Sequence, residues 1–255
     1  MAAEPRPIAG PVPFAVPWTQ GPLHGDRIAP SGPPGPPSSS LPPAAPFSEA
    51  LILHGAGASD RTRFLELRRE LAREGVASAA FDMVGHGQTG GELLGQSLEM
   101  RTGQARAVVQ GLNLPQPLAL LGASMGAHTA IQLLRHFNVR SLVLLVPAVY
   151  DRRARDLPFG PRFTKAIRRP GSWRGSDDWD LLANYTGRLL VVAGEKDEVI
   201  PREIVEQLGG SAPKAREAKL YMAPGASHYL FTDLRQSDPA AFREAFGLIR
   251  DFLAG

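Results

Sequence analysis

The chain has 255 residues, is 43% hydrophobic and 21% charged, and carries a formal net charge of +3. This composition excludes a collagen-like or wholly disordered chain, and so small a charge gives no reason to expect a nucleic-acid partner. No apolar run approaches the eighteen or so residues that a membrane span needs. The absence of cysteine excludes disulfides and thiolate metal sites. The first residues lack the basic start and apolar stretch of a secretory signal, so we expect a cytoplasmic location.

The first 46 residues form a proline-rich segment that contains 14 of the 24 prolines. Proline donates no backbone N–H, so this segment is not expected to supply a central strand. Residues 12–18 and 23–28 are expected to pair as a hairpin at an edge of the sheet. Residues 31–46 have the composition of an extended connector.

From residue 47 onward, short apolar runs alternate with segments of helical periodicity. Strands are expected at 50–53, 77–81, 117–121, 142–146, 189–193 and 219–222. Helices are expected at 60–75, 97–112, 125–137 and 239–253. This alternation predicts parallel βαβ units, hence an α/β fold with a mostly parallel central sheet flanked by helices.

One segment breaks the alternation. Residues 147–187 lie between two expected strands, contain several aromatic residues among many charges, and are longer than a crossover requires. We expect them to form a small cap or lid insert. The expected core therefore comprises residues 47–146 and 188–255.

The pentapeptide Gly122-Ala-Ser124-Met-Gly126 matches the pattern G-x-S-x-G, which is typical of a strand-to-helix turn that exposes a nucleophilic serine. The pentapeptide alone is a weak signal, but here it directly follows an apolar strand and directly precedes a helix. Flanking glycines suit such a turn because side chains would collide with the neighbouring strand and helix. Ser124 is therefore the candidate nucleophile, and an ordinary glycine-rich turn is the alternative.

A serine nucleophile needs a base, which an acid orients. In a parallel sheet these groups lie on loops at the carboxyl ends of strands, which is where Asp197 and His228 occur. Glu195 and Glu198 are alternative acids.

Other acidic and histidine side chains are expected to have structural roles. Asp82 precedes the serine in the chain and is expected to brace its own turn. His54 and His86 are expected to bond to backbone groups of glycine-rich turns, and His128 to pack one helical turn beyond Ser124. The remaining two histidines, His24 and His136, are expected to be structural or solvated.

In the order Ser124, Asp197, His228, this constellation resembles the α/β-hydrolase superfamily, over about residues 47–253. His54-Gly-Ala-Gly57 resembles its oxyanion loop, and Asp82-Met-Val-Gly-His-Gly87 resembles a glycine-rich turn of its monoacylglycerol lipase-like and feruloyl esterase-like members. The residues that follow, 88–90, depart from that pattern, since many relatives have a serine there. The resemblance implies that Ser124, Asp197 and His228 are the catalytic residues.

An oxyanion hole requires two backbone N–H groups aimed at the developing charge. Met125, which follows the candidate nucleophile, is expected to supply one of them. The resemblance implies Ala56 for the other, with Gly57 as the alternative.

The sequence thus predicts a serine hydrolase that cleaves a small or medium carboxylic ester through an acyl-enzyme intermediate. A thioesterase or amide hydrolase with the same residues, or a non-hydrolytic binding protein of the same fold, is the alternative. We expect a small-molecule ester substrate, no cofactor and no metal, and the oligomeric state stays open.

Residues 151–178 contain eight Lys or Arg against four Asp. This excess has two interpretations: a solvated helical face, or a group of cations that favours substrates carrying a carboxylate or a phosphate.

Overall fold

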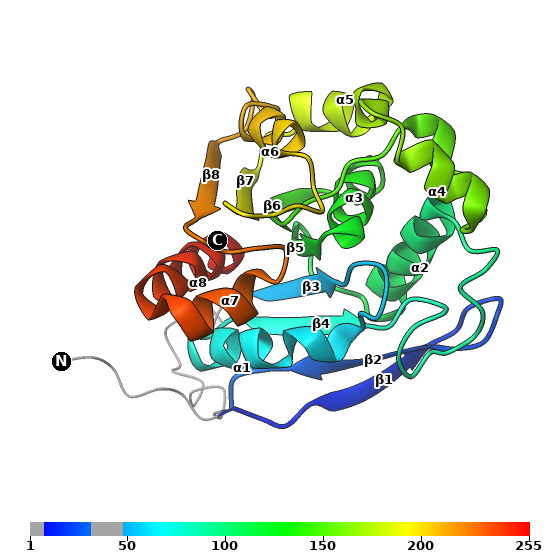
Figure 1. Cartoon of the computed structure of the whole chain (residues 1–255). Helices are drawn as coiled ribbons and strands as arrows, with labels where there is room; N and C mark the ends of the chain where they lie inside the picture. Colours follow the sequence, from blue (N-terminus) through cyan, green and yellow to red (C-terminus); the bar gives the residue numbers. More distant parts are fainter. Residues whose placement is uncertain (1–7, 32–47) are drawn as a thin grey trace.

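The computed structural model describes residues 8–31 and 48–255. Almost all of the connector expected at 31–46 lies outside these ranges. One eight-stranded sheet runs through the described part (Figure 1), in the order β1-β2-β4-β3-β5-β6-β7-β8. The strands are β1 (Val12–Val16), β2 (Leu23–Ile28), β3 (Glu49–Leu53), β4 (Ala77–Phe81), β5 (Leu118–Ala123), β6 (Val139–Leu145), β7 (Arg188–Gly194) and β8 (Glu217–Ala223).

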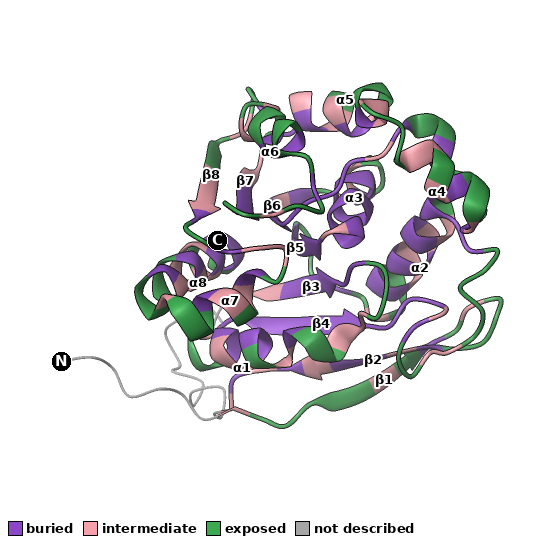
Figure 2. Ribbon diagram, in the orientation of Figure 1, coloured by how far each residue is buried: buried purple, intermediate pink, exposed green. Residues whose placement is uncertain are grey.

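The six strands β4-β3-β5-β6-β7-β8 are parallel to one another, whereas β2 is antiparallel to both β1 and β4. The strands β4 and β5 are buried along their whole length, while β1 at the edge is mostly exposed (Figure 2). The predicted fold class, a mostly parallel sheet flanked by helices, is confirmed.

Helices cover both faces of the sheet (Figure 1). One face packs against α1 (Leu65–Arg73), α7 (Leu230–Ser237) and α8 (Pro239–Ala254). The other face packs against α2 (Leu98–Gly111), α3 (Met125–Gln132) and α6 (Arg202–Gly209). Each face encloses its own apolar core, because the inward side chains of a parallel sheet alternate between the two faces. No helix in the described residues has the length and apolar character that crossing a bilayer requires.

Helix boundaries follow local capping chemistry where the sequence provides it. The side chain of Ser97 accepts a hydrogen bond from the backbone N–H of Met100 and starts α2, and Asp238 caps α8 in the same way, just before Pro239. The helices α6 and α7 were not expected. The helix expected at 125–137 ends at Gln132 and tightens into the 3₁₀ turn η2 (Leu133–Arg135), since the chain must enter β6 soon afterwards.

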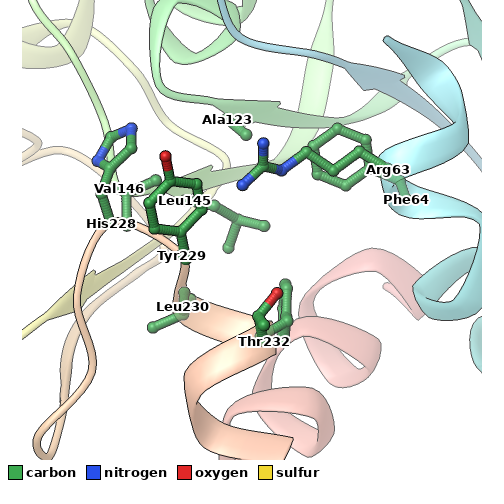
Figure 3. Close-up of a pocket in the computed structure, with 10 residues that line it drawn as sticks. Arg63, Phe64, Ala123, Leu145, Val146, His228, Tyr229, Leu230 and Thr232 are labelled. Atoms are coloured by element: carbon green, nitrogen blue, oxygen red, sulfur yellow. The ribbon is translucent and has the colours of Figure 1, made fainter. Parts of the chain in front are cut away.

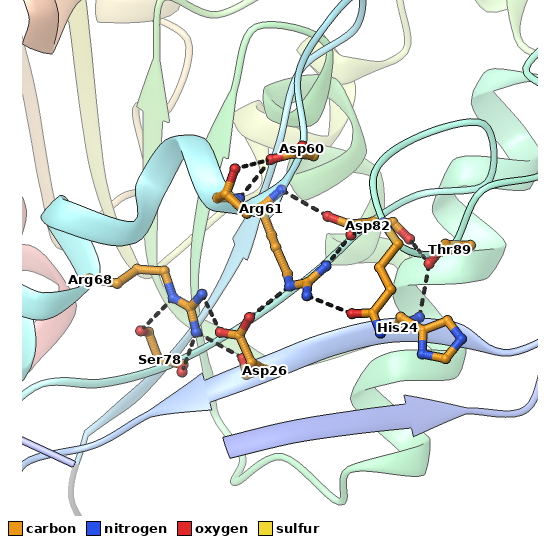
Figure 4. A network of polar contacts seen from close by, with 10 residues as sticks. His24, Asp26, Asp60, Arg61, Arg68, Ser78, Asp82 and Thr89 are labelled. Atoms are coloured by element: carbon orange, nitrogen blue, oxygen red, sulfur yellow. Dashed lines mark hydrogen bonds and ion pairs between the residues drawn. The ribbon is translucent and has the colours of Figure 1, made fainter. Parts of the chain in front are cut away.

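The β1–β2 hairpin is attached to the sheet by a network of ion pairs (Figure 4). Asp26 of β2 pairs with Arg68 of α1 and with Arg61 of the 3₁₀ turn η1 (Arg61–Phe64), both at 2.6 Å. Arg61 also pairs with Asp82, the residue after β4. The Asp82 carboxylate accepts a further bond from the backbone N–H of Gln88 at 2.8 Å, so it braces its own turn, as expected.

The segment between β6 and β7 folds as a set of short helices. These are η3 (Arg152–Ala154), α4 (Pro161–Ile167), η4 (Ser172–Gly175) and α5 (Asp178–Ala183). Phe159 and Phe163 of this insert pack with Leu98 of α2 and Met125 of α3. The insert therefore packs against the start of α3.

Candidate active site

The predicted site residues follow four parallel strands at the same edge of the sheet. Ala56 follows β3, Ser124 follows β5, Asp197 follows β7 and His228 follows β8. The chain leaves β3 toward β4 on one side and returns to β5 on the other. Such a point, where the strand order reverses, is where open α/β sheets bind ligands.

Ser124 has a strained backbone, with φ 51° and ψ −119°, which non-glycine residues rarely adopt. Glycine is required on either side. A Cβ on Gly126 would lie 2.3 Å from the carbonyl oxygen of Leu53, and one on Gly122 would lie 2.3 Å from the carbonyl oxygen of Gly126. The strand-to-helix turn thus has the conformation that the pentapeptide predicts, and it leaves Ser124 partly exposed.

His228 and Asp197 are hydrogen-bonded to each other: Nδ1 of His228 lies 2.8 Å from Oδ2 of Asp197. The Asp197 side chain is only 3% exposed, and its Oδ1 accepts bonds from the backbone N–H groups of Val199 and Ile200. Burial tends to raise the pKa of Asp197, but the bonds from His228, Ile200 and Val199 outweigh it and hold the pKa below its ordinary value.

Neither alternative acid contacts His228. Glu195 accepts a bond from the backbone N–H of Gly225 at 2.8 Å, and Glu198 is exposed. A Cβ on Gly194 would lie 2.4 Å from the carbonyl oxygen of Ala226. This close approach brings the loop of Asp197 against the loop of His228.

Ser124 and His228 line one cavity of about 230 Å³, together with Ala56, Arg63 and Tyr229. A smaller cavity of about 80 Å³ continues beside His228, with the guanidinium of Arg63 extending over the Tyr229 ring at 5.1 Å (Figure 3). The cavities of about 230 and 80 Å³ are therefore both bordered by an aromatic ring, Tyr229, and a cation, Arg63.

A third and larger cavity, of about 790 Å³, begins at the same serine. Its walls come from the residues after β6, from the insert and from the loop after Asp197; among them are Val149, Trp173, Ile200 and Ile204. Ser124 therefore lies where two cavities meet, so that both sides of a bond under attack could be accommodated.

The expected oxyanion donors lie next to Ser124. The loop after β3 touches it, since a Cβ on Gly55 would lie 3.1 Å from the Ser124 Cβ. Ala56 and Met125 both border the cavity of about 790 Å³, and Ala56 also borders the cavity of about 230 Å³. The N–H of Met125 is the first of α3, so it has no acceptor within the helix and lies at its positive end.

Comparison with known proteins identifies the family. Residues 45–173, just over half of the chain, match the hydrolase family described as serine aminopeptidase, S33. The chain belongs to this hydrolase family. The matched region contains Ser124 and ends before Asp197 and His228. A search of curated proteins finds no match to the sequence.

Solved structures show the same fold. The esterase EaEST of Exiguobacterium antarcticum superposes with a TM-score of 0.67 at 21% identity, covering 94% of this chain and 99% of the esterase. Est1E of Butyrivibrio proteoclasticus with ferulic acid bound gives a TM-score of 0.67 at 19% identity, covering 94% and 97%. A monoacylglycerol lipase of Paleococcus ferrophilus gives 0.62 at 19% identity, covering 81% and 93%. The predicted α/β-hydrolase membership is confirmed.

In this S33-family hydrolase, a buried cation supports the loop after β3, and the sequence analysis did not find it. Nη2 of Arg101 donates to the carbonyl oxygens of His54 and Gly55, at 2.7 and 3.2 Å. Burial lowers the pKa of Arg101 to about 10, so the guanidinium stays protonated at neutral pH. No sequence signal marks Arg101, because it occurs among other polar residues of α2.

One histidine of the S33-family hydrolase, His54, bonds to backbone groups as expected. His54 accepts from the N–H of Met83 through Nε2 at 3.0 Å, so its Nδ1 carries the proton and donates to the carbonyl of Gly55. Burial and the nearby Arg101 and His86 lower the pKa of His54 well below its ordinary value. Burial and Arg101 likewise lower the pKa of His86.

A second buried histidine–carboxylate pair in this hydrolase is not part of the cavity walls described above. Nδ1 of His128 is 2.7 Å from Oδ2 of Asp178, and Oδ1 of Asp178 accepts from Nε2 of Gln132 at 2.6 Å. The pair joins α3 to α5 of the insert. His128 is packed, as expected, but its partner Asp178 was not found by sequence analysis.

Within residues 8–31 and 48–255, no three His, Asp or Glu side chains of the S33-family hydrolase converge in a way that would hold a metal ion.

Proposed function

We propose that this protein is a serine hydrolase that cleaves a carboxylic ester, with Ser124 as nucleophile, His228 as base and Asp197 as the orienting acid. One observation carries the proposal: His228 is bonded to buried Asp197 on one side and borders the cavity of Ser124 on the other. Because Nδ1 of His228 donates to Asp197, Nε2 is left to accept a proton from the serine.

In the proposed first step, Oγ of Ser124 attacks the ester carbonyl carbon while its proton passes to Nε2 of His228. The negative charge develops on the carbonyl oxygen, where the N–H groups of Ala56 and Met125 stabilise it. The carbon–oxygen bond to the alcohol then breaks, and the alcohol leaves with the proton from His228. Water attacks the acyl-enzyme by the same route and releases the acid and free Ser124.

The charges around the site favour an ester over the aminopeptidase substrate in the family's description. An aminopeptidase must hold a protonated α-amino group, which requires acidic side chains. The walls of the two cavities contain three arginines, Arg63, Arg168 and Arg169, and one acidic residue, Glu198. Such a surface disfavours an ammonium group.

We also propose that residues 147–187 act as the cap of the site, over the core formed by 47–146 and 188–255. Side chains from this segment, including Tyr150, Ile167 and Trp173, border the cavity that begins at Ser124. These apolar surfaces support a role in holding the substrate.

Labelling with a fluorophosphonate probe and hydrolysis of a nitrophenyl ester test the proposal. Ser124→Ala should abolish labelling and lower kcat by about 10⁴- to 10⁶-fold, because the nucleophile is gone while the oxyanion donors remain. Ser237→Ala, which removes an exposed serine of α7, is the matched control and should label like the parent. Parent-level hydrolysis by Ser124→Ala, or faster cleavage of an amino-acid nitroanilide than of every ester, would contradict the proposal.

A further inference from the structure

The cavity of about 790 Å³ that begins at Ser124 has both apolar and charged walls. Val149, Ile200 and Ile204 supply apolar surface. At the insert it is bordered by Arg168 and Arg169, both exposed to solvent. A cavity of this size is in the range that binds small molecules.

The backbone that presents these two arginines is held in a defined turn at the end of α4. The N–H of Ser172 donates to the carbonyl of Arg169 at 2.9 Å, and its hydroxyl donates to the carbonyl of Ile167 at 3.0 Å. Gly171 has φ 68°, which closes the turn in a conformation that favours glycine. The backbone of Arg168 and Arg169 thus has a fixed position at the cavity wall, from which both side chains extend.

Several other cations of the insert are already engaged. Arg153 pairs with Asp151, Arg155 pairs with Asp177, and the guanidinium of Arg174 lies over the Trp173 ring at 4.6 Å. In the part of the chain that the structure describes, Arg168 and Arg169 form no ion pair and no side-chain hydrogen bond. The single carboxylate on the wall of the same cavity is Glu198, which is exposed.

Resting on the proposed ester hydrolysis, we propose that the natural substrate is an amphiphilic ester with an anionic group, carboxylate or phosphate, distant from the scissile bond. The apolar wall would take the chain next to the ester, and Arg168 and Arg169 would take the anion. Guanidinium groups bind both anions through paired, charge-assisted hydrogen bonds.

The first test compares kcat/KM for two nitrophenyl esters of the same dicarboxylic acid. In the anionic ester the second carboxyl group is free, and in the neutral ester it is capped as a methyl ester. A second series carries a terminal phosphate, and a third places the carboxylate on the alcohol. We expect an advantage of about tenfold for the anionic ester in at least one series, falling as salt rises from about 20 to about 500 mM, because exposed charges are screened. The series with the larger ratio of anionic to neutral kcat/KM shows whether a carboxylate or a phosphate is preferred.

Matched variants locate the effect. Arg168→Gln/Arg169→Gln should bring the ratio of anionic to neutral ester close to one. Arg162→Gln/Lys165→Gln removes the same charge from α4 outside the cavity wall and should leave the ratio within about twofold. Glu198→Gln should raise the ratio, because it removes the opposing charge. An equal loss in both double variants would attribute the preference to net charge and overturn the inference.

Binding to the Ser124→Ala variant separates this inference from the proposed chemistry. Calorimetry with a dicarboxylic acid monoanilide and its methyl ester needs no hydrolysis. Tighter binding of the anionic anilide, lost in Ser124→Ala/Arg168→Gln/Arg169→Gln, supports the anion subsite even if the parent cleaves no ester. Equal binding of both anilides overturns the proposed anion subsite. If the parent then hydrolyses neutral esters rapidly, the proposed function is supported without the subsite.

Discussion

Asp197 and Glu195 lie two residues apart on one loop, yet their carboxylates point to different partners. Asp197 accepts from His228 and from two backbone N–H groups, whereas Glu195 accepts only from the backbone of Gly225. A side chain that holds the proton of His228 on Nδ1 controls which nitrogen faces the serine. Glu195 can only support the loop.

We therefore expect Asp197→Asn to lower kcat by about 10⁴-fold, because the amide favours the wrong tautomer and cannot stabilise the imidazolium. Glu195→Gln should lower kcat far less. Steady-state hydrolysis of a nitrophenyl ester by the two purified variants measures both effects. A larger loss for Glu195→Gln would move the acid to that residue.

Asp197 should also make stability depend on pH. Its pKa is lower in the folded protein than the ordinary value near 3.9, so its stabilising contribution is fully present above about pH 5 and is lost as the pH falls through the folded-state pKa. The difference in the free energy of unfolding between the parent and Asp197→Asn should therefore shrink between about pH 5 and pH 2.5. Urea unfolding across this range measures the difference, and a constant value would exclude the expected linkage.

At the scale of elements, the buried His128–Asp178 pair joins the helix of the candidate nucleophile to the insert. The two side chains are 3% and 0% exposed, and Asp178 also accepts from Gln132. Burying a carboxylate is costly unless its oxygens are bonded. Here both oxygens have partners, so the position of α5 depends on α3.

Asp178→Asn should destabilise the protein by about 2–4 kcal/mol, because an amide N–H₂ would replace an oxygen that now accepts from His128 or Gln132. Asp180→Asn, on the exposed side of α5, should change stability by less than about 0.5 kcal/mol. Urea unfolding measures both values. Similar small effects in the two variants would show that the pair does not hold the insert.

At the scale of the whole molecule, buried ion pairs help to hold the N-terminal hairpin at its place in the sheet. The ion pairs of Asp26 with Arg61 and Arg68 join β2 to η1 and α1, and Arg61 also pairs with Asp82 in the turn after β4 (Figure 4). The side chain of Arg68 is 1% exposed. Without Asp26 this guanidinium would be a buried charge with no counter-ion.

Asp26→Ala should therefore cost about 3–5 kcal/mol in the free energy of unfolding, because the remaining charges stay buried. Glu66→Gln is the control, since the ion pair of Glu66 with Arg69 is exposed on both sides and should be worth less than about 1 kcal/mol. Thermal or urea unfolding compares them. Equal losses would mean that the buried network adds nothing beyond a surface pair.

Much of the fold could be predicted because its signals are local. Apolar runs such as 77–81 and 189–193 form strands within a residue or two of the expected bounds, and Ser97 caps the expected helix. Once the strands are parallel, their carboxyl ends share one edge. For this reason the positions of Ser124, Asp197 and His228 at the same edge, each after one of the parallel strands, could be predicted from chain order alone.

Only the tertiary structure decided the contacts that depend on long-range packing. It placed Asp197, and neither Glu195 nor Glu198, against His228, because the direction of a side chain in a loop depends on the path of the neighbouring loop. It also placed Arg101 under the loop after β3, and brought Arg168 and Arg169 to the cavity of Ser124. A polar residue looks the same in sequence whether it is solvated or buried, since burial is set by elements distant in the chain.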